Sequence, residues 1–362
     1  MPRPIMAAIH MGALRHNLQV MRQAANGRAL WAVVKANAYG HGLLRAARAF
    51  EQADGLALID LCDAQKLREN GWKKRILLLE GFFDESDIDL LEKYDIETIV
   101  HNRRMIDMLV AHAPYSSLKV HIKINSGMNR LGFLPAEEDS VSEKLSAIEG
   151  VKVMGAVTHF ANAEPSYANE KPASVPIQLT RMAQINPAPN HLCMANSAAT
   201  LWHKEVKGDA VRAGVALYGA SPDAHYTSED LGIIPAMTLS AKILAIQNVP
   251  SGEAIGYGSR FVTKRDSRIA VVACGYADGY PRSTPDGTPT YVEGHIAPIA
   301  GAISMDMLTI DVTDIPDAQL GSVVELWGKH VPVNEVANRC GTIGYELMCA
   351  IALRVPIVED DE

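Results

Sequence analysis

One lysine of this chain stands directly after a short apolar run, where it could act as a covalent catalyst. The run from Leu30 to Val34 is mostly branched or aromatic and contains no polar residue, which is typical of a strand buried on both faces of a parallel sheet. Gly40 and Gly42 follow, and the residues from Leu43 to Ala53 predict a helix. Lys35 is therefore expected at the carboxyl end of a strand, which is the end that carries the chemistry in barrels of parallel strands.

Apolar surroundings would make the Lys35 amine reactive. Burial disfavours an ammonium ion, so the pKa of a buried lysine falls and the neutral amine can attack a carbonyl group to form a Schiff base. Most lysines at strand ends only extend to water, however, and a single lysine favours that ordinary interpretation.

Short apolar segments alternate with helical patterns over the first part of the chain. Eight such segments are expected to be strands: Leu30–Val34, Gly55–Ile59, Arg75–Leu79, Ile96–Val100, Lys119–Ile124, Lys152–Val157, His191–Met194 and Ala210–Arg212. The alternation requires right-handed parallel crossovers, and it predicts an α/β fold with a closed (β/α)8 barrel of the TIM type. An open, doubly wound sheet would give the same rhythm.

The pattern changes after about residue 230, so we expect two domains, 1–230 and 231–362. The second is expected to be mostly β, because its strand-like segments are separated by Gly, Pro and Asp turns. These segments are Thr238–Val249, Arg268–Cys274, Thr290–Val292, His295–Ile299, Met307–Val312 and Val323–Trp327. Helix is expected near Val333–Asn338 and again after Tyr345, and the strand-like segment Ala7–His10 could pair with this domain.

Composition argues against several kinds of partner. The net charge is −8 and no basic block is present, which argues against nucleic acid. The first residues lack an apolar signal core and no apolar run reaches membrane-spanning length, so we expect a cytoplasmic protein without a membrane partner. The 5 cysteines form no C-x-x-C pair and the 12 histidines no H-E-x-x-H motif, so we expect neither a disulfide framework nor a metal site.

Polar residues collect after the predicted barrel strands. They are Lys35, Arg130, His159, Asn196, Ser197, Arg212 and Gly214. Each alone is more often a helix cap or part of a surface ion pair, but the carboxyl ends of all barrel strands meet at one rim, so together they predict a site.

The last two barrel loops predict a phosphate site. Asn196 and Ser197 open an apparent helix from Ala198 to Trp202, whose free N–H groups and dipole attract a phosphate. Gly214 lets backbone amides approach the same place, and the loops after strands seven and eight often bind phosphate in such barrels. A cofactor with a phosphate and an aldehyde that reacts with lysine is pyridoxal phosphate.

The run from Val33 to Gly42 resembles, without a gap, the pyridoxal-phosphate lysine motif of bacterial alanine racemases. Further similar segments extend the resemblance over almost the entire chain: Asn125–Phe133, Val211–Gly219, Gly256–Gly258, Cys274–Arg282, Gly301–Asp306 and Thr342–Glu346. The family more often has Asp-Thr where this chain has Asn125-Ser126, so the sequence does not decide whether one contact behind the site is kept.

The resemblance implies a racemase with two bases. Lys35 would serve the D-specific face of the substrate, and Tyr257 from the other subunit of a homodimer would serve the L-specific face. Because an ordinary tyrosine has a pKa of about 10, His159 and Arg212 would bias its hydroxyl through a hydrogen-bonded chain. Arg212 would face the pyridine nitrogen, and a guanidinium with a pKa above ~12 does not readily protonate that nitrogen. The ring is then a weaker electron sink, which limits side reactions.

The resemblance also implies roles for the remaining residues. The cofactor phosphate would be bound by Tyr39, Ser197, Gly214, Val215 and Tyr345, with Asn196 beside them. The substrate carboxylate would be bound by Arg130 and by the backbone amide of Met305, and Asp306 and Tyr276 would line the entrance. Lys123, seven residues before Arg130, stands where many relatives carry a carbamylated lysine. Tyr276 and Arg282 could equally be a turn tyrosine and a surface arginine.

The expected function is alanine racemase, an isomerase that interconverts L-alanine and D-alanine, either to supply D-alanine for peptidoglycan or to serve alanine catabolism. Three alternatives are less favoured. The first is a racemase for another or several amino acids, because a pocket separates substrates that differ by one methylene by only ~1–3 kcal/mol. A decarboxylase on the same architecture would prefer a carboxylate at Arg212. A non-catalytic pyridoxal-phosphate carrier would lack the second domain and Tyr257.

Overall fold

The computed structural model describes residues 3–167, 171–185 and 191–361. It divides into two compact units. One consists of Leu18–Ala38 and Gly42–Leu217, and the other of Met1–Asn17, Tyr39–His41 and Tyr218–Glu362. We refer to them as the barrel unit and the β unit.

The barrel unit is a closed barrel of eight parallel strands. In order around the barrel they are β2 (Ala29–Val33), β3 (Gly55–Leu58), β4 (Arg75–Leu78), β5 (Glu97–Val100), β6 (Leu118–Lys123), β7 (Val151–Val157), β8 (Leu192–Ala195) and β9 (Ala210–Ala213). Pairing of β9 with β2 closes the barrel. The (β/α)8 fold expected from the sequence is confirmed, with strand limits within one or two residues of the expected ones.

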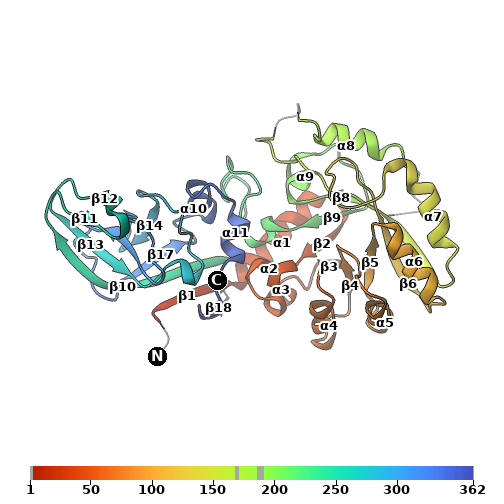
Figure 1. The fold of residues 1–362 in the computed structure, drawn as a ribbon, viewed down its shortest axis with the longest axis horizontal. Helices are drawn as coiled ribbons and strands as arrows, with labels where there is room; N and C mark the ends of the chain where they lie inside the picture. The colour runs from red at the N-terminus through yellow and green to blue at the C-terminus, as the bar shows by residue number, and fades with distance from the viewer. Residues whose placement is uncertain (1–2, 168–170, 186–190, 362) are drawn as a thin grey trace. The chain divides into compact units, whose positions relative to one another are not determined.

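Helices cover the outside of the barrel, as Figure 1 shows for α4 to α7. They are α3 (Leu43–Ala49), α4 (Leu61–Glu69), α5 (Glu85–Lys93), α6 (Arg103–His112), α7 (Glu138–Ser146), α8 (Val175–Met182) and α9 (Ser197–Trp202), and α1 (Met11–Ala25) precedes the first barrel strand. Side chains of Asp60, Asp84, Asn102 and Asn196 accept hydrogen bonds from the first free N–H groups of four of these helices. Such caps explain where the helices begin.

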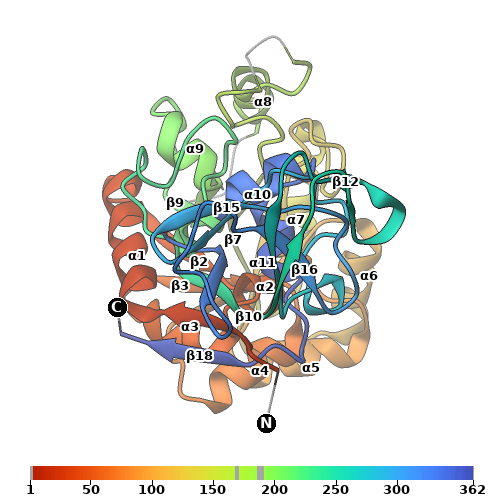
Figure 2. The same ribbon diagram turned by 90° about the vertical axis from the view of Figure 1, so that its left-hand side faces the viewer.

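The β unit is built on an eight-stranded sheet. Its main path runs β15 (His295–Pro298), β14 (Pro289–Val292), β17 (Val323–Trp327), β10 (Met237–Val249), β1 (Ile5–His10) and β18 (Ile357–Asp360), while β13 (Ser267–Val272) joins β10 to β16 (Leu308–Asp311). Strand β1 lies beside β18 (Figure 2) and pairs with β10 on its other edge. The N-terminal strand therefore belongs to this sheet, so the pairing expected for Ala7–His10 is confirmed.

Smaller elements complete the β unit. A two-stranded sheet consists of β11 (Ala254–Ile255) and β12 (Phe261–Val262), and two helices follow the main strands, α10 (Val333–Arg339) and α11 (Gly344–Cys349). The sequence placed the last helix after Tyr345, which is wrong by two residues, because helix α11 begins at Gly344 and includes Tyr345. Strand β18 was not expected from the sequence, since its Val-Glu-Asp-rich end carries little apolar pattern.

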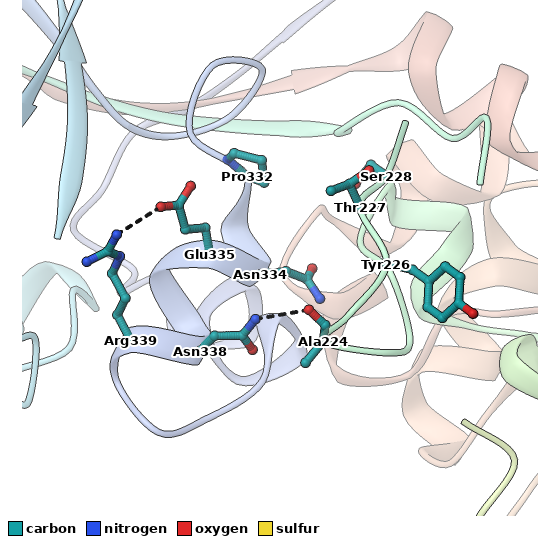
Figure 3. Close-up of a pocket in the computed structure, with 9 residues that line it drawn as sticks. All are labelled: Ala224, Tyr226, Thr227, Ser228, Pro332, Asn334, Glu335, Asn338 and Arg339. Atoms are coloured by element: carbon teal, nitrogen blue, oxygen red, sulfur yellow. Dashed lines mark hydrogen bonds and ion pairs between the residues drawn. The ribbon is translucent and has the colours of Figure 1, made fainter. Parts of the chain in front are cut away.

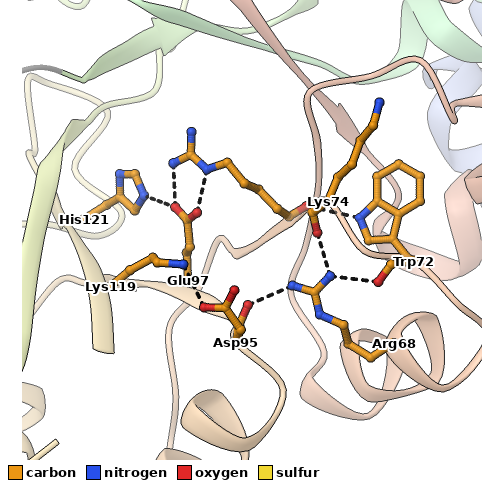
Figure 4. A network of polar contacts seen from close by, with 8 residues as sticks. Arg68, Trp72, Lys74, Asp95, Glu97, Lys119 and His121 are labelled. Atoms are coloured by element: carbon orange, nitrogen blue, oxygen red, sulfur yellow. Dashed lines mark hydrogen bonds and ion pairs between the residues drawn. The ribbon is translucent and has the colours of Figure 1, made fainter. Parts of the chain in front are cut away.

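A buried ion pair lies at the amino-terminal ends of barrel strands, opposite to the ends that Lys35 follows. Glu97 begins β5, is 2% exposed, and accepts hydrogen bonds from Arg75 Nε (2.6 Å) and Arg75 Nη2 (2.7 Å). It also accepts a hydrogen bond from His121 Nε2 (2.8 Å), as Figure 4 shows. The Arg75 guanidinium also lies 4.6 Å from the centre of the Trp31 ring. Burial would raise the pKa of Glu97, but the bonds from Arg75 and His121 lower it to about 2. This end of a barrel serves stability rather than chemistry.

We expect E97Q to lower the free energy of unfolding by about 3 kcal/mol at pH 7, because it leaves the cation of Arg75 without its buried partner. The pKa of Glu97 is depressed on folding, so its contribution is present above the unfolded-state value of about 4.3 and is lost as the pH falls towards about 2. The difference in the free energy of unfolding between wild type and E97Q, measured with denaturant, should therefore shrink below pH 5. The exposed Glu149 offers the control E149Q, and a constant difference between E97Q and wild type from pH 7 to pH 3 would contradict the expectation.

Candidate active site

Lys35 opens a left-handed turn at the end of the first barrel strand. The next residues, Ala36 to Ala38, have φ of 53°, 50° and 55° in the segment α2 (Lys35–Tyr39). Non-glycine residues in this conformation cost on the order of 1–2 kcal/mol each, and such strain gathers at functional sites. The Asn37 side chain accepts a hydrogen bond from Leu43 N–H (2.9 Å), which ties the turn to the start of α3. The sequence pattern predicted a turn here but not its handedness.

Three cationic side chains gather around one histidine at the same end of the barrel. Lys123 ends β6 and lines a small pocket together with Arg130 and His159. Burial, followed by the charges of Arg212 and Arg130, lowers the pKa of Lys123 to about 7. A substantial fraction of this amine is therefore neutral, and nucleophilic, near neutral pH.

The His159 imidazole is held in its neutral form. Burial and the charge of Arg212, with smaller effects from Lys123, Arg130 and Lys35, lower the pKa of His159 well below its ordinary value. Because the charge of Lys35 contributes to this pKa shift, Lys35 lies near His159 and the three cations within the barrel unit. The sequence-predicted residues Lys35, Lys123, Arg130, His159 and Arg212 thus form one electrostatic cluster.

The Arg212 side chain is fixed from several sides. It lies in β9 and is buried, and its guanidinium donates hydrogen bonds to the carbonyl oxygens of Thr158 (2.5 Å) and Cys193 (2.7 Å) and to Cys193 Sγ (3.0 Å). It also lies 3.4 Å from His159 Nδ1. An arginine N–H can only donate, so His159 Nδ1 accepts and the neutral ring carries its proton on Nε2.

Supporting contacts behind this cluster were missed by the sequence analysis. Gln178, in α8, donates to Ser126 Oγ (2.7 Å) and to the His159 carbonyl (3.0 Å). The Ser126 hydroxyl also bonds Thr158 Oγ1 (2.7 Å). Ser126, where the resembled family more often has threonine, therefore keeps a hydroxyl in this network. A glutamine in an ordinary helical stretch gives no sequence signal for such a role.

The two loops expected to bind a phosphate meet each other. Asn196 caps α9 through a bond from Ala199 N–H (2.9 Å), so α9 begins at Ser197, one residue before the start expected from the sequence. The Ser197 hydroxyl accepts a hydrogen bond from Gly214 N–H (2.8 Å), and Val215 follows at the start of a short helical turn. The barrel unit thus brings Ser197, Gly214 and Val215 together.

The other two residues expected at the phosphate belong to the β unit. The rings of Tyr39 and Tyr345 have their centres 6.0 Å apart, and Tyr218 stacks on Tyr39 at 4.7 Å. Burial, aided by Cys349, raises the pKa of Tyr39 above its ordinary value. Tyr39 therefore remains a neutral phenol that can donate a hydrogen bond. Tyr218 was missed as a partner of Tyr39, although it stands within the resembled segment Val211–Gly219.

The remaining predicted residues lie on loops of the β unit. Tyr257, 73% exposed, lies in the connection between β11 and β12. Met305 and Asp306 lie in the loop before β16, and Tyr276 begins a single helical turn, η4 (Tyr276–Asp278). The side chains of Tyr257, Tyr276 and Met305 are all exposed in this chain. They and Lys35 belong to different units.

Comparison with known families accounts for both units. Residues 9–222 match the family "Alanine racemase, N-terminal domain", and residues 236–359 match "Alanine racemase, C-terminal domain". The chain belongs to the alanine racemase family. The family and the enzyme class expected from the sequence, an isomerase, are confirmed.

Individual alanine racemases are similar over their full length. The chain is 47% identical to the alanine racemase of Erwinia tasmaniensis and 48% identical to the catabolic alanine racemase of Klebsiella aerogenes, each with 99% of both chains covered. Its structure resembles the crystal structure of the biosynthetic alanine racemase from Pseudomonas aeruginosa, with a TM-score of 0.94, 39% identity and 99% of both chains covered.

A separate cavity of about 520 Å³ lies in the β unit of this alanine racemase family member (Figure 3). Asn338 Nδ2 donates to the Ala224 carbonyl (3.3 Å) at its wall, and Arg339 pairs with Glu335 (3.3 Å). None of the residues expected to do chemistry lines it. In the described ranges, no three His, Cys, Asp or Glu side chains gather as a metal site, and no helix is long and apolar enough to cross a membrane.

Proposed function

We propose that this protein interconverts L-alanine and D-alanine with pyridoxal phosphate bound to Lys35. The observation that carries the proposal is the cluster of Lys123, Arg130 and Arg212 around a neutral His159 and within electrostatic reach of Lys35. The described hydrogen bonds of buried Arg212 go to carbonyl oxygens, a thiol and an imidazole rather than to a carboxylate. Such an arrangement favours an anionic ligand.

The donor set of this chain fits the cofactor. Ser197 and the amides of Gly214 and Val215 would bind its phosphate at the loops after β8 and β9. The phenol of Tyr39, kept neutral by burial, and the phenol of Tyr345 would donate to the same phosphate. When bound, pyridoxal phosphate supplies an electron sink that acidifies the α-proton of the amino acid.

Two side chains would remove and return the α-proton of the amino acid: Lys35 on the D-specific face and Tyr257 on the L-specific face. His159 carries its proton on Nε2, because Nδ1 accepts from Arg212. It would donate that proton in a hydrogen bond to the Tyr257 oxygen and stabilise the phenolate that a general base requires. Arg212 would keep the pyridine nitrogen unprotonated, since a guanidinium holds its protons.

The carboxylate of the substrate would be bound by Arg130 and by the Met305 N–H group. Among the described residues, no hydrogen bond uses the N–H of Met305, and its side chain is exposed. Asp306 and Tyr276 would line the path to the site. Tyr257, Met305, Asp306 and Tyr276 would come from the second subunit of a homodimer, an arrangement supported by the exposure of three of them in the single chain. The cytoplasmic location expected from the sequence stays a prediction.

The function is tested by racemisation and by mapping of the cofactor lysine. Purified protein with bound cofactor should convert either enantiomer of alanine into the racemate in a chiral product assay. After borohydride reduction, peptide mapping should find the pyridoxyl group on Lys35, and K35A should lose racemisation. Bound cofactor without turnover of alanine would instead indicate a carrier, and a pyridoxyl group on another lysine would refute the assignment of Lys35.

We further expect Lys123 to be carbamylated. The burial and neighbouring charges that lower its pKa to about 7 leave a neutral amine that can add to carbon dioxide, forming a carbamate and releasing one proton. The resulting anion would pair with Arg130 and replace one positive charge of the cluster with a negative one. Carbon-13 NMR of protein in labelled bicarbonate should give a carbamate signal that is absent from K123A. An unmodified amine at saturating bicarbonate would exclude the modification.

A further inference from the structure

A carboxylate with no solvent exposure lies in the motif Cys274–Arg282, whose turn is hydrogen-bonded to the loop of Met305 and Asp306. Asp278, at 0% exposure, ends the turn η4, and its Oδ2 accepts a hydrogen bond from Gly275 N–H (2.9 Å). Its Oδ1 accepts from Arg354 Nε (2.7 Å). A buried carboxylate charge requires such partners, and here the Gly275 N–H group of the turn and the Arg354 guanidinium supply them.

Arg354 connects this carboxylate to the loop that carries the proposed substrate contacts. Its Nη2 donates to Asp306 Oδ1 (2.7 Å) while its Nε bonds Asp278. Arg3 Nη2 lies 3.9 Å from Asp278 Oδ2 and donates to the backbone carbonyl of Asp306. The guanidinium groups of Arg3 and Arg354 thus alternate with the carboxylates of Asp278 and Asp306 next to the loop.

The backbone of the turn is also bonded to the loop. Tyr276 N–H donates to the Ser304 carbonyl (3.0 Å), and Ala277 N–H donates to the Met305 carbonyl (3.0 Å). The two backbones approach so closely that a Cβ at Gly275 would lie 2.4 Å from the carbonyl oxygens of Ser304 and Met305. The carbonyls of Ser304 and Met305 are therefore fixed, and the Ser304 carbonyl belongs to the same planar peptide as the Met305 N–H group.

We propose that Asp278 is a positioning residue that, through Arg354, holds the Met305–Asp306 loop in the orientation that presents the Met305 N–H to the substrate carboxylate. This inference rests on the proposed function. Asp278 touches neither substrate nor cofactor in this scheme. It acts by bonding Gly275 and Arg354, and a carboxylate is required because both of its neighbours are donors.

The variants D278N and R354M test this role. Asparagine offers one acceptor oxygen and one NH2 donor, so it leaves either Gly275 N–H or Arg354 Nε facing another donor. R354M removes the guanidinium group that bonds both Asp278 and Asp306. R354K keeps the positive charge but cannot donate to the two carboxylates from one planar group. The control is D314N, which removes a carboxylate from the exposed pair of Arg265 and Asp314 in the same unit.

We expect KM for alanine to rise about 10-fold in D278N and R354M while kcat stays within about 3-fold, because a lost carboxylate contact weakens substrate binding. R354K should be intermediate and D314N unchanged. A merely structural defect would lower the active fraction, and hence kcat, without moving KM. Should D278N not fold, R354M carries the test, since the Arg354 side chain is 38% exposed.

Hydrogen exchange separates this proposal from the proposed function. The amides of residues 303–307 should exchange faster in R354M than in wild type and D314N. Unchanged exchange together with an unchanged KM in R354M would overturn the positioning role. Absence of racemisation by wild-type protein would instead overturn the proposed function, because the exchange difference is measured without turnover.

Discussion

Replacing Tyr257 with phenylalanine should slow exchange of the α-proton of L-alanine with deuterated solvent by about 100-fold or more, the loss typical of a positioned general base. The substitution removes one hydroxyl from a side chain that is 73% exposed in the single chain, so folding and cofactor binding should be kept. Lys35 would still reach the α-proton of D-alanine. Some exchange on the D side should therefore persist without racemisation.

The control for this substitution is Y226F. Tyr226 lies at the separate cavity in the same unit and is also partly exposed, so the same loss of one hydroxyl should leave both exchange rates unchanged. Proton NMR with each enantiomer gives the two rates separately. An equal loss on both faces would indicate a shared defect, and near-normal racemisation by Y257F would remove Tyr257 from the mechanism.

Much of the barrel could be predicted because its strands are buried on both faces. Continuous apolar runs mark such strands without any alternation, and β3, which has no polar side chain, is buried at every position. The place of Lys35 followed from the same pattern, since a polar residue directly after a buried strand lies at one rim. The resemblance then supplied roles that no apolar pattern contains, such as that of Tyr257.

Contacts between distant segments could not be predicted in this way. Gln178 and Asp278 stand in an ordinary helix and an ordinary turn, and their importance comes from partners 52 and 76 residues away. The left-handed turn after Lys35 was missed because Ala36 and Ala38 disfavour that conformation, which the surrounding bonds impose. Strand β18 forms because β1 offers it a free edge rather than because its sequence is strand-like. The domain boundary near residue 230 stays a prediction, which limited proteolysis would test.

Mixing two inactive variants should restore activity if each site is completed by a second subunit. A heterodimer of K35A and Y257F would contain one site with both native residues and one with neither. Random subunit exchange makes half of the dimers heterodimers, so we expect about a quarter of the wild-type racemisation rate. The gain should follow the kinetics of exchange, as measured with differently labelled subunits.

The matched control is the double variant K35A/Y257F mixed with wild type. If the residues act across subunits, each site of this heterodimer lacks one base, so exchange should lower the activity contributed by the wild-type chains. If Lys35 and Tyr257 act within one chain, the results reverse: K35A with Y257F stays inactive, and the wild-type chain keeps its site beside the double variant. The two mixtures contain the same substitutions in the same amounts. Their difference therefore depends only on which chain supplies each base.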